Sequence, residues 1–435
     1  SCNDPALRQR LARSLENLDR AFIGTIHSFC ARLLRERPVE AGVRVGFEEA
    51  DEETDAELRA EAWQLYLSGL YAEGDDSLDR LDELGLEPAA LERAYQTLCR
   101  FGDLDDSCWP APETPLPDSA ALVEVLRGYS AHMASLELPD DPGNDKLIPA
   151  YRLVPRLVRL LDLGRPAGLA EALEVFKPLK LVHYVWPGKK EQALREWERW
   201  EAFRNEFAAP WLSRWLAHRY PAALRFALAG RKVYQELLNE RGLLSYQDLL
   251  CRAAALLRSN ARVRRYFRAR FSHVLVDEFQ DTDPLQAEVL LLLTAADPEE
   301  TDWRRCVPVP GSLFVVGDPK QSIYRFRRAD IVTYNQVRAR IEAAGGMVVS
   351  LSANFRTDPD LIEWINGSFH KAFEERTGPC SPDWMPLQPG RFPETCGELS
   401  GVRALRFEKD VRQVTRVETV HLARFIRQAL DRGLT

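Results

Sequence analysis

The sequence lacks long apolar runs. Unbroken apolar stretches such as residues 289–293 are far shorter than the roughly 18 residues that a membrane-spanning helix needs. The first five residues have neither a basic start nor an apolar core, which excludes a secretion signal there. We therefore expect a cytoplasmic protein that crosses no membrane.

Cysteines are few and lack the spacing of a metal site. None of the eight belongs to a Cys-x-x-Cys pair, which favours reduced thiols over a disulfide framework or a zinc site. The sequence also has no internal repeat, and 45% apolar with 29% charged residues exclude a disordered or fibrous chain. At 435 residues it is long enough for about three domains.

Net positive charge is lacking too, which argues against a nucleic-acid binder. The formal charge is −8, whereas affinity for phosphate backbones comes largely from Lys and Arg. The distribution is uneven, because acidic residues concentrate in 48–57 and 75–83 while seven arginines lie within 252–270. Each run by itself indicates a solvated helix face more often than a binding site.

The first half of the chain predicts helices. From about residue 50 to 240, apolar side chains recur at three- and four-residue spacings. Within this region, residues 103–118 and 137–149 are rich in Pro, Asp and Gly and predict surface loops. Upstream of it, residues 21–25 predict a short strand and residues 28–37 a helix.

The second half changes to an α/β pattern. Short apolar runs alternate with helices, which predicts a parallel sheet covered on both faces. The three runs are residues 274–276, 313–316 and 347–351. Asp283-Pro284 and Asp358-Pro359 predict helix starts after the first and third runs. A further strand at 402–407 and a helix at 411–431 would close the chain.

An acid pair, Asp277 and Glu278, follows the first of these strands. In open parallel sheets, ligands bind at the carboxyl ends of the strands. An acid pair there can divide the work of NTP hydrolysis, with one carboxylate holding Mg²⁺ and the other orienting the attacking water. The alternative is an acidic loop that caps the next helix.

The second and third strands lead into further candidate residues. Gly317 permits a tight turn, after which Gln321 would project into the same crevice as an amide able to contact a phosphate or a water. Rings and arginines then alternate over 323–328, as in a channel for single-stranded nucleic acid; core aromatics beside surface arginines are the alternative. Arg356 could reach a γ-phosphate across a domain cleft, although helix capping or a salt bridge is the commoner use.

Together these segments resemble one family, the UvrD/Rep-type superfamily 1 DNA helicases, and within it the RecB/AddA branch of exonuclease V-like helicase-nucleases. The matching motifs are GTIHSFC at 24–30, SYQDLL at 245–250, VDEFQDT at 276–282, VGDPKQSIYRFR at 316–327 and LSANFRT at 351–357. Ordered motifs of this length leave little room for chance.

The resemblance implies ATP and Mg²⁺ as cofactors and a role for each matching residue. Asp277 would hold Mg²⁺, Glu278 would activate water and Gln321 would sense the γ-phosphate. Arg356 would contact that phosphate from a second motor domain, with Phe355 against the adenine. The residues that would touch or position single-stranded DNA are Thr25, His27, Tyr324, Phe326 and Arg327.

The resemblance also implies an architecture, an α/β fold with a partial RecA-like P-loop NTPase motor core and a large helical insertion. Residues 1–37 and 236–345 would form the first motor domain, 38–235 the insertion and 346–435 the start of the second motor domain. The implied function is an ATP-dependent DNA helicase or translocase in repair and recombination. It would act on single-stranded or duplex DNA, and a second helicase-nuclease subunit is a possible partner.

The sequence departs from the family pattern at two places. The phosphate loop, Gly-x-x-x-x-Gly-Lys-Ser/Thr, is absent, since the Gly188-Lys189 dipeptide has neither the earlier glycine nor a following hydroxyl residue. Arg328 stands where the family usually has glycine. We therefore expect an internal fragment of a longer helicase, without ATPase activity of its own.

Two rival functions stay open. Asp277 with Asp318-x-Lys320 mimics the acid triad of restriction-type nucleases, but Pro319 would remove a ladder hydrogen bond from a central strand. The other rival is a non-catalytic, helicase-like scaffold that holds DNA or a partner without turning over ATP. The intact acid pair argues against that scaffold for the parent protein.

Overall fold

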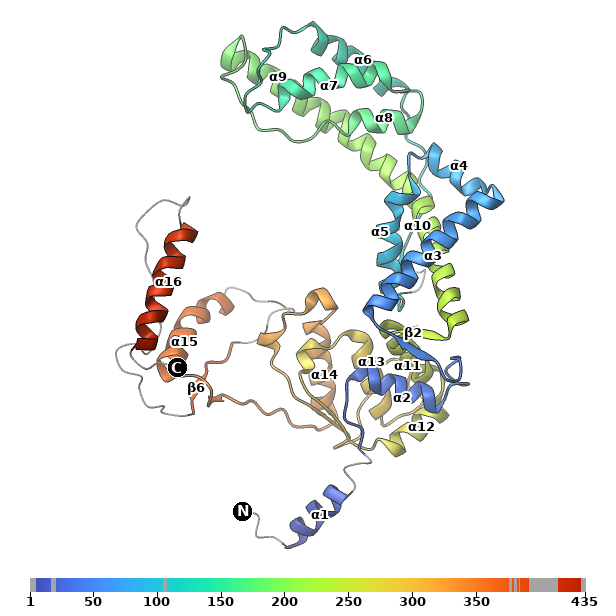
Figure 1. Ribbon diagram of the computed structural model, residues 1–435, viewed down its shortest axis with the longest axis vertical. Helices are drawn as coiled ribbons and strands as arrows, with labels where there is room; N and C mark the ends of the chain where they lie inside the picture. The colour runs from blue at the N-terminus through green and yellow to red at the C-terminus, as the bar shows by residue number, and fades with distance from the viewer. Residues whose placement is uncertain are drawn as a thin grey trace. The chain divides into compact units, whose positions relative to one another are not determined.

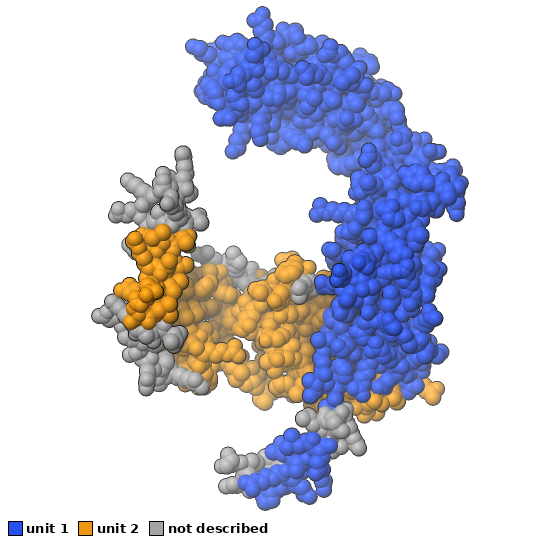
Figure 2. All heavy atoms as spheres, in the orientation of Figure 1, with its two compact units in different colours: residues 1–253 blue, residues 254–435 orange. Residues whose placement is uncertain are grey.

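The computed structural model describes residues 5–16, 21–104, 108–374, 378, 382, 384–390 and 414–431. The chain divides into two compact units, residues 1–253 and 254–435, which Figure 2 colours separately. Helices dominate the described residues, and short parallel strand pairs lie among them (Figure 1). In this part of the chain, every helix is too short or too polar to cross a membrane.

Two short strands of unit 1, one before and one after its helical region in the sequence, pair in parallel. After helices α1 (Pro5–Glu16) and α2 (Ile26–Glu36), strand β1 (Glu48–Ala50) pairs with β2 (Leu243–Ser245), with Glu48 opposite Leu243. Helix α11 (Tyr246–Ser259) follows β2 directly. The chain therefore enters its helical region after β1 and returns from it beside the same strand.

Helix α2 confirms the helix predicted at 28–37, but the strand predicted at 21–25 is wrong. Residues 21–25 are open backbone, and the Thr25 Oγ1 accepts the Ser28 N–H at 3.2 Å to cap α2. A strand needs a partner for its ladder of hydrogen bonds. Among the described residues none pairs with this segment, and its one large aliphatic side chain, Ile23, is exposed.

The helical region of unit 1 confirms the helical pattern predicted from residue 50 to 240. Its elements are α3 (Glu52–Glu73), α4 (Asp76–Glu83), α5 (Pro88–Arg100), α6 (Ala120–Ser135), α7 (Leu147–Leu160), α8 (Pro166–Leu173), α9 (Lys189–Phe203), the π-helical turn η3 (Arg204–Ala208) and α10 (Ala209–Arg241). The described parts of the loops predicted at 103–118 and 137–149 connect α5 to α6 and α6 to α7, although α7 begins at Leu147.

Two apolar cores stabilise this region, and the 33-residue helix α10 contributes to both (Figure 1). One core, around the buried Trp63 and Tyr95, joins α3 and α5 to the second half of α10. The other core, around the buried Tyr151 and Trp200, is formed by the four helices α6, α7, α8 and α9 together with the first half of α10. Large buried aromatic side chains of this kind contribute much of the energy of a core.

Unit 2 alternates short strands with helices. Its elements after α11 are α12 (Ala261–Arg270), β3 (Val274–Val276), the 3₁₀ turn η4 (Phe279–Asp281), α13 (Pro284–Thr294), β4 (Leu313–Val315), the 3₁₀ turns η5 (Pro319–Gln321) and η6 (Arg325–Arg327), α14 (Ile331–Ala343), β5 (Ala353–Asn354), α15 (Pro359–Glu374), β6 (Gln388–Pro389) and α16 (Val414–Asp431). The helix starts predicted at Asp283 and Asp358 are confirmed: Asp283 caps α13 by accepting the Gln286 N–H at 2.7 Å, and α15 begins after Asp358.

The predicted parallel pairing is confirmed for the first two strands, but the prediction of two covered faces is wrong. β3 and β4 are parallel, with Val274 opposite Leu313. Side chains alternate between faces along a strand. Leu275 and Phe314, which share one face, are 74% and 60% exposed, because the described residues cover only the opposite face.

The strand predicted at 347–351 is wrong for a related reason. Its apolar residues Met347, Val349 and Leu351 are exposed, and no described strand lies beside them. The pairing begins slightly later, where β5 runs parallel to β6. The strand predicted at 402–407 lies outside the described residues, and the closing helix is observed from Val414 as α16.

The arginine run at 252–270 is more than a solvated face. Arg264 is buried and donates to the carbonyl of Glu300, and Arg268 donates to the carbonyls of Ala295 and Ala296 at 2.9 Å. Arg258 donates to the Glu288 carboxylate of α13 at 2.7 Å. The guanidinium groups of Arg264 and Arg268 anchor the loop after α13, so the solvated-face interpretation is wrong for these two residues, whereas Arg258 is exposed.

Candidate functional site

The carboxyl ends of β3 and β4 place the acid pair beside the glycine turn. The ladder continues beyond the strands, since the Val316 N–H donates to the Val276 carbonyl and the Phe279 N–H donates to the Val316 carbonyl, both at 2.8 Å. The segments that begin at Asp277 and at Gly317 are therefore neighbours. This is the edge of a parallel sheet where ligands bind.

The two acidic residues differ in conformation. Asp277 is exposed, and its Oδ1 accepts the N–H of Glu278 at 3.0 Å. Glu278 has φ 51° and ψ 41°, the left-handed region that residues other than glycine rarely adopt. Such strained backbone clusters at functional sites, where the surrounding structure holds it in place. Both carboxylates lie at the open surface of the site.

Gln280 connects the acid pair to the segment after β4. Its side chain is 3% exposed; the Nε2 donates to the Glu278 Oε2 at 2.6 Å and the Oε1 accepts the Asp318 N–H at 3.0 Å. Its own carbonyl accepts the Ser322 Oγ at 3.2 Å. Side-chain and backbone groups of one buried residue therefore fix two loops against each other.

Gly317 is needed because the two loops approach closely. A Cβ atom at this position would lie 2.8 Å from the Gln280 Oε1 and 3.1 Å from the backbone nitrogen of Phe279. Tyr334 of α14 supports the turn, since its hydroxyl donates to the Gly317 carbonyl at 3.3 Å. Glycine at position 317 thus serves both the tight turn and the close approach of the neighbouring backbone.

Gln321, the predicted γ-phosphate sensor, is exposed in η5 and folds back on its own loop. Its Nε2 donates to the Asp318 Oδ2 at 3.2 Å, and Lys320 forms an ion pair with the Asp318 Oδ1 at 3.3 Å. Pro319 lies in this 3₁₀ turn and not within a strand. Lys320 thus has its ionic partner inside the turn.

Asp281 adds a third carboxyl group next to the acid pair. Its Oδ1 is buried and has no hydrogen-bond partner among the described residues. Burial, followed by the negative charge of Glu278, raises the pKa of Asp281. A buried carboxyl oxygen without a hydrogen-bond partner is unusual, because buried polar atoms are nearly always paired.

The aromatic–arginine block follows as a second exposed 3₁₀ turn, η6. Phe326 is 78% exposed and its ring centroid lies 5.8 Å from that of Tyr324, so these rings are not part of a core. The side chain of Arg327 lies outside the described residues. Arg328 ends the turn with φ 72°, the conformation for which the family's glycine is suited.

Phe355 and Arg356 follow β5. The Asn354 Oδ1 accepts the backbone N–H groups of Arg356 and Thr357 at 2.9 Å, which fixes the turn that presents them. The exposed Phe355 ring packs beside Gly390, where an added Cβ would lie 2.7 Å from the ring. Within the described residues, Arg356 has no hydrogen bond or ion pair to the acid pair or to Gln321.

Thr25 and His27 belong to unit 1. Thr25 is the residue that caps α2, and it is exposed. The His27 ring lies 5.4 Å from that of Tyr246, the first residue of α11. The structure therefore brings the GTIHSFC motif next to the SYQDLL motif, whose Ser245 Oγ donates to the Asp248 Oδ2 at 2.6 Å.

Sequence reasoning assigned no role to Gln280, Asp281 or Tyr334. All three contact, or lie beside, residues that it did select. Gln280 bonds a residue 38 positions away, which local sequence patterns do not reveal. The signal that could have found it is a polar residue directly behind a buried aromatic in the turn after a strand.

The donor set of this site fits a nucleotide-bound Mg²⁺. Such ions are held by one or two carboxylates together with substrate phosphates and water. One Asp277 oxygen accepts a backbone N–H, which leaves the second oxygen available. The described residues contain no group of three or more His, Cys, Asp or Glu that could hold a metal ion without a substrate.

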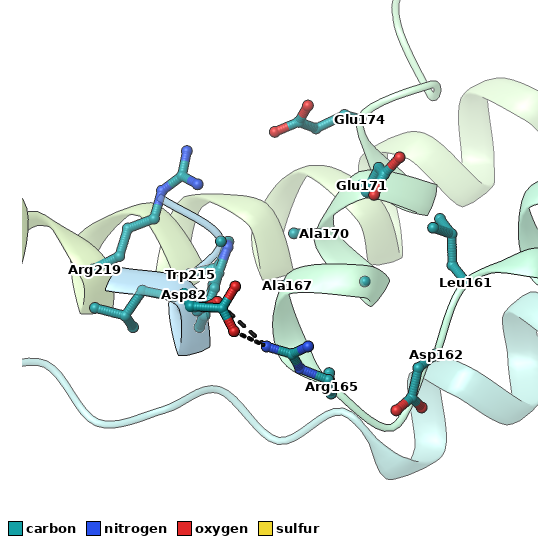
Figure 3. A pocket seen from close by; sticks show the side chains of 13 residues that line it. Asp82, Leu161, Asp162, Arg165, Ala167, Ala170, Glu171, Glu174, Trp215 and Arg219 are labelled. Atoms are coloured by element: carbon teal, nitrogen blue, oxygen red, sulfur yellow. Dashed lines mark hydrogen bonds and ion pairs between the residues drawn. The ribbon is translucent and has the colours of Figure 1, made fainter. Parts of the chain in front are cut away.

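The helical region of unit 1 contains a pocket (Figure 3). It has a volume of about 410 Å³, and the ion pair between Arg165 and Asp82 crosses it at 2.9 Å. None of the predicted site residues lines it. Its lining residues therefore assign it no part in the proposed site.

The chain has recognisable relatives among known proteins. Residues 5–342 match the UvrD/REP helicase N-terminal domain. An ATP-dependent helicase/nuclease subunit from Exiguobacterium sibiricum is 26% identical over 428 residues, covering 85% of this chain and 33% of the relative. The corresponding protein from Geobacillus thermodenitrificans is 27% identical over 434 residues, with the same coverage of 85% and 33%.

A shorter match is more similar. The RecBCD enzyme subunit RecB of Mycolicibacterium smegmatis is 40% identical over 149 residues, which cover 33% of this chain and 12% of the relative. The chain spans about a third of the length of the helicase/nuclease subunits that it matches, 33% in both cases above. It is thus distantly homologous to these subunits over most of its own length.

Proposed function

Because the chain belongs to the UvrD/REP helicase family, we propose that it forms part of an ATP-driven DNA helicase or translocase with RecA-like motor domains. One observation carries the proposal: the acid pair at the end of β3 lies beside the Gly317–Gln321 turn at the end of β4, and Gln280 links them. Neighbouring strand ends are where a motor of this kind would handle its nucleotide.

The chemistry proposed for the site is ATP hydrolysis. Bound Mg²⁺ would neutralise phosphate charge, and Asp277 would hold it through its available oxygen. Glu278 would orient and deprotonate the attacking water, for which its exposed carboxylate is suited. Gln321 would exchange its bond to Asp318 for a phosphate oxygen.

Two residues of the second motor domain would complete the nucleotide site. Arg356 would add positive charge at the γ-phosphate, where charge develops during transfer. Phe355 offers an exposed ring for the adenine, and both residues follow the same asparagine-capped turn. Because the sequence has no phosphate-loop motif, turnover would require a phosphate loop that these residues do not supply.

Single-stranded DNA is the proposed track. Exposed Tyr324 and Phe326 rings would stack on bases, and Arg327 would hold a phosphate. Thr25 and His27 would contribute further contacts from unit 1. Because the relatives are named as subunits, we propose that the parent protein works with a second, helicase-nuclease subunit. The family resemblance of the motifs is the basis for proposing a role in DNA repair and recombination in the cytoplasm.

Measurement of ATPase activity tests the proposal. The material is a longer form, the chain extended by the coding sequence upstream of residue 1 in its gene. We expect DNA-dependent ATP hydrolysis, and Glu278→Gln should lower kcat by about 10²- to 10⁴-fold while sparing nucleotide binding. Glu299→Gln, a matched change at an exposed residue, is the control. Normal turnover by Glu278→Gln would refute the base assignment.

Fluorescence anisotropy with a labelled oligonucleotide tests the track. In the longer form, Phe326→Ala should weaken binding of single-stranded DNA by about 1–3 kcal/mol, because base stacking on a ring is lost. Phe369→Ala removes a ring that is also exposed, on α15, and serves as the control. Unchanged affinity in the Phe326 variant would remove that residue from the proposed track.

A further inference from the structure

We propose that Gln280 is a positioning residue, which holds the Glu278 carboxylate in place and couples it to the loop of residues 317–322. The inference rests on the proposed function and deepens it. Gln280 is buried and is not among the residues proposed to contact the nucleotide or DNA. It acts through the residues on either side of it.

The side-chain amide of Gln280 has a different partner at each end. The NH₂ group of Gln280 faces a carboxylate, 2.6 Å from the Glu278 Oε2, and its oxygen faces a backbone N–H, 3.0 Å from the Asp318 nitrogen. The reverse orientation would set oxygen against oxygen and N–H against N–H. The two partners therefore fix the amide in one orientation, and the amide in turn fixes the Glu278 carboxylate.

The hydrogen bonds of the Gln280 side chain are shielded from water. Gln280 is 3% exposed, whereas the Glu278 side chain that it holds is exposed. Water can compete for the outer oxygen of Glu278 but has little access to the amide behind it. A buried hydrogen bond to a charged group is stronger than its exposed counterpart and orients its partner.

Gln280 forms hydrogen bonds with residues near both ends of the 317–322 loop. Its side-chain oxygen accepts the Asp318 N–H, and its carbonyl accepts the Ser322 Oγ at 3.2 Å. A Cβ atom at Gly317 would lie 3.0 Å from the Gln280 backbone nitrogen, so the loop packs directly against this residue. This loop carries Gln321 and leads directly into the turn with Tyr324 and Phe326. A movement of this loop would therefore move the Glu278 carboxylate through the Gln280 side chain.

Hydrogen exchange of the chain itself tests the link without any catalysis. Mass spectrometry of a peptide spanning Asp318 should show exchange at least tenfold faster in Gln280→Met, which keeps the side-chain volume but neither donates nor accepts. Gln286→Met makes the same change on α13, where no hydrogen bond of the side chain is described, and should leave this exchange unchanged. Unchanged exchange in Gln280→Met overturns the link.

Kinetics of the longer form test the positioning role. Gln280→Met should lower kcat at least tenfold with KM for ATP within about twofold, and Gln286→Met should match the wild type. Wild-type kcat in Gln280→Met overturns the proposal. If the longer form hydrolyses no ATP at all, the proposed function fails, and hydrogen exchange still decides whether the link exists.

A pH profile of Gln280→Glu separates positioning from a merely structural role and does not depend on Gln280→Met folding. When ionised, the new carboxylate repels Glu278; when protonated, it offers one donor and one acceptor as the amide does. The kcat deficit relative to wild type should therefore shrink at least tenfold between pH 8 and pH 6. A deficit that stays constant over this range overturns the hydrogen-bonding role.

Discussion

Arg328 has the left-handed backbone that glycine tolerates best. Its φ of 72° closes the η6 turn, with its N–H donating to the Arg325 carbonyl at 3.0 Å. A residue with a Cβ atom pays about 1–2 kcal/mol for this conformation. The departure from the family pattern at this position therefore keeps the turn and adds strain to it.

The strain at Arg328 can be measured with two substitutions. Arg328→Gly and Arg328→Ala both remove the side chain, so the difference between them isolates the backbone. We expect the glycine variant to be more stable than the alanine variant by about 1 kcal/mol, as judged from denaturant unfolding. An alanine variant more stable than the glycine variant by about 0.4–1 kcal/mol, which is the gain at an unstrained position, would show that the left-handed conformation is not strained.

Asp281 predicts a pH-dependent stability. Because burial and the charge of Glu278 raise its pKa, the folded state favours the protonated carboxyl group. Its contribution is present at acidic pH and is lost as the pH rises through the raised pKa. Asp281→Asn should therefore raise the melting temperature at pH 7, and the gain should fade toward about pH 4, where the carboxyl group protonates in both states.

The opposite pH trend in Asp281→Asn, with a gain that grows on acidification, would contradict this assignment. Asp277→Asn serves as the matched control, since Asp277 is exposed and accepts a backbone N–H. Calorimetric scans from pH 4 to pH 8 would give both profiles.

At the scale of elements, the buried helix α13 carries one charged residue, Glu288, which forms an ion pair with Arg258. Its side chains from Leu285 to Thr294 are almost all buried, and Glu288 among them is 6% exposed. Burial raises the pKa of Glu288, and its bonds to the Arg258 guanidinium oppose that rise. The arginine thus keeps a charge compatible with an otherwise apolar helix.

Removal of that arginine should destabilise unit 2. Arg258→Met leaves Glu288 buried without its cation, at a cost of about 1–3 kcal/mol at pH 8. The loss should shrink at pH 5, because the Glu288 pKa would rise further and the protonated group needs no cation. Arg262→Met, on the exposed part of α12, is the control, and thermal unfolding at the two pH values is the measurement. A loss that does not change with pH would argue for lost packing instead.

The elements also show how far sequence reasoning reaches. Residues 274–276 were identifiable as a strand because an apolar run ends sharply at two acids, and β3 has these bounds. The runs at 21–25 and 347–351 look similar in composition but lack a described partner strand. Whether a run finds a partner depends on residues far away in sequence, which a local pattern does not contain.

The same limit explains the candidate site. Asp277, Glu278 and Gln321 could be chosen because each follows a strand or a glycine turn, and the structure places their segments side by side. Gln280 could not be assigned a role, since its partner Asp318 reaches it only through the parallel pairing of β3 and β4. Local chemistry selected the candidate residues, and the strand topology shows which side chain links their segments.

At the scale of the whole molecule, the sequence contains the proposed residues for hydrolysis but lacks the motif that would bind the phosphates. The 435 residues carry the acid pair but no phosphate-loop motif. We therefore expect the 435-residue chain to show no DNA-dependent ATPase activity in a coupled steady-state assay. Turnover that survives further purification and disappears in Glu278→Gln would prove that another part of this chain binds the phosphates.

The parallel pairing of β1 with β2 has a consequence for how the helical region can evolve. Glu48 lies opposite Leu243, so the helices between the two strands begin and end at one point. Lengthening a connection whose ends are already held together costs little, about 0.6 kcal/mol for each doubling of its length. The helical region between the two strands can therefore change in length or be replaced during evolution, while the three-residue pairing of β1 with β2 and the turns beside it stay unchanged.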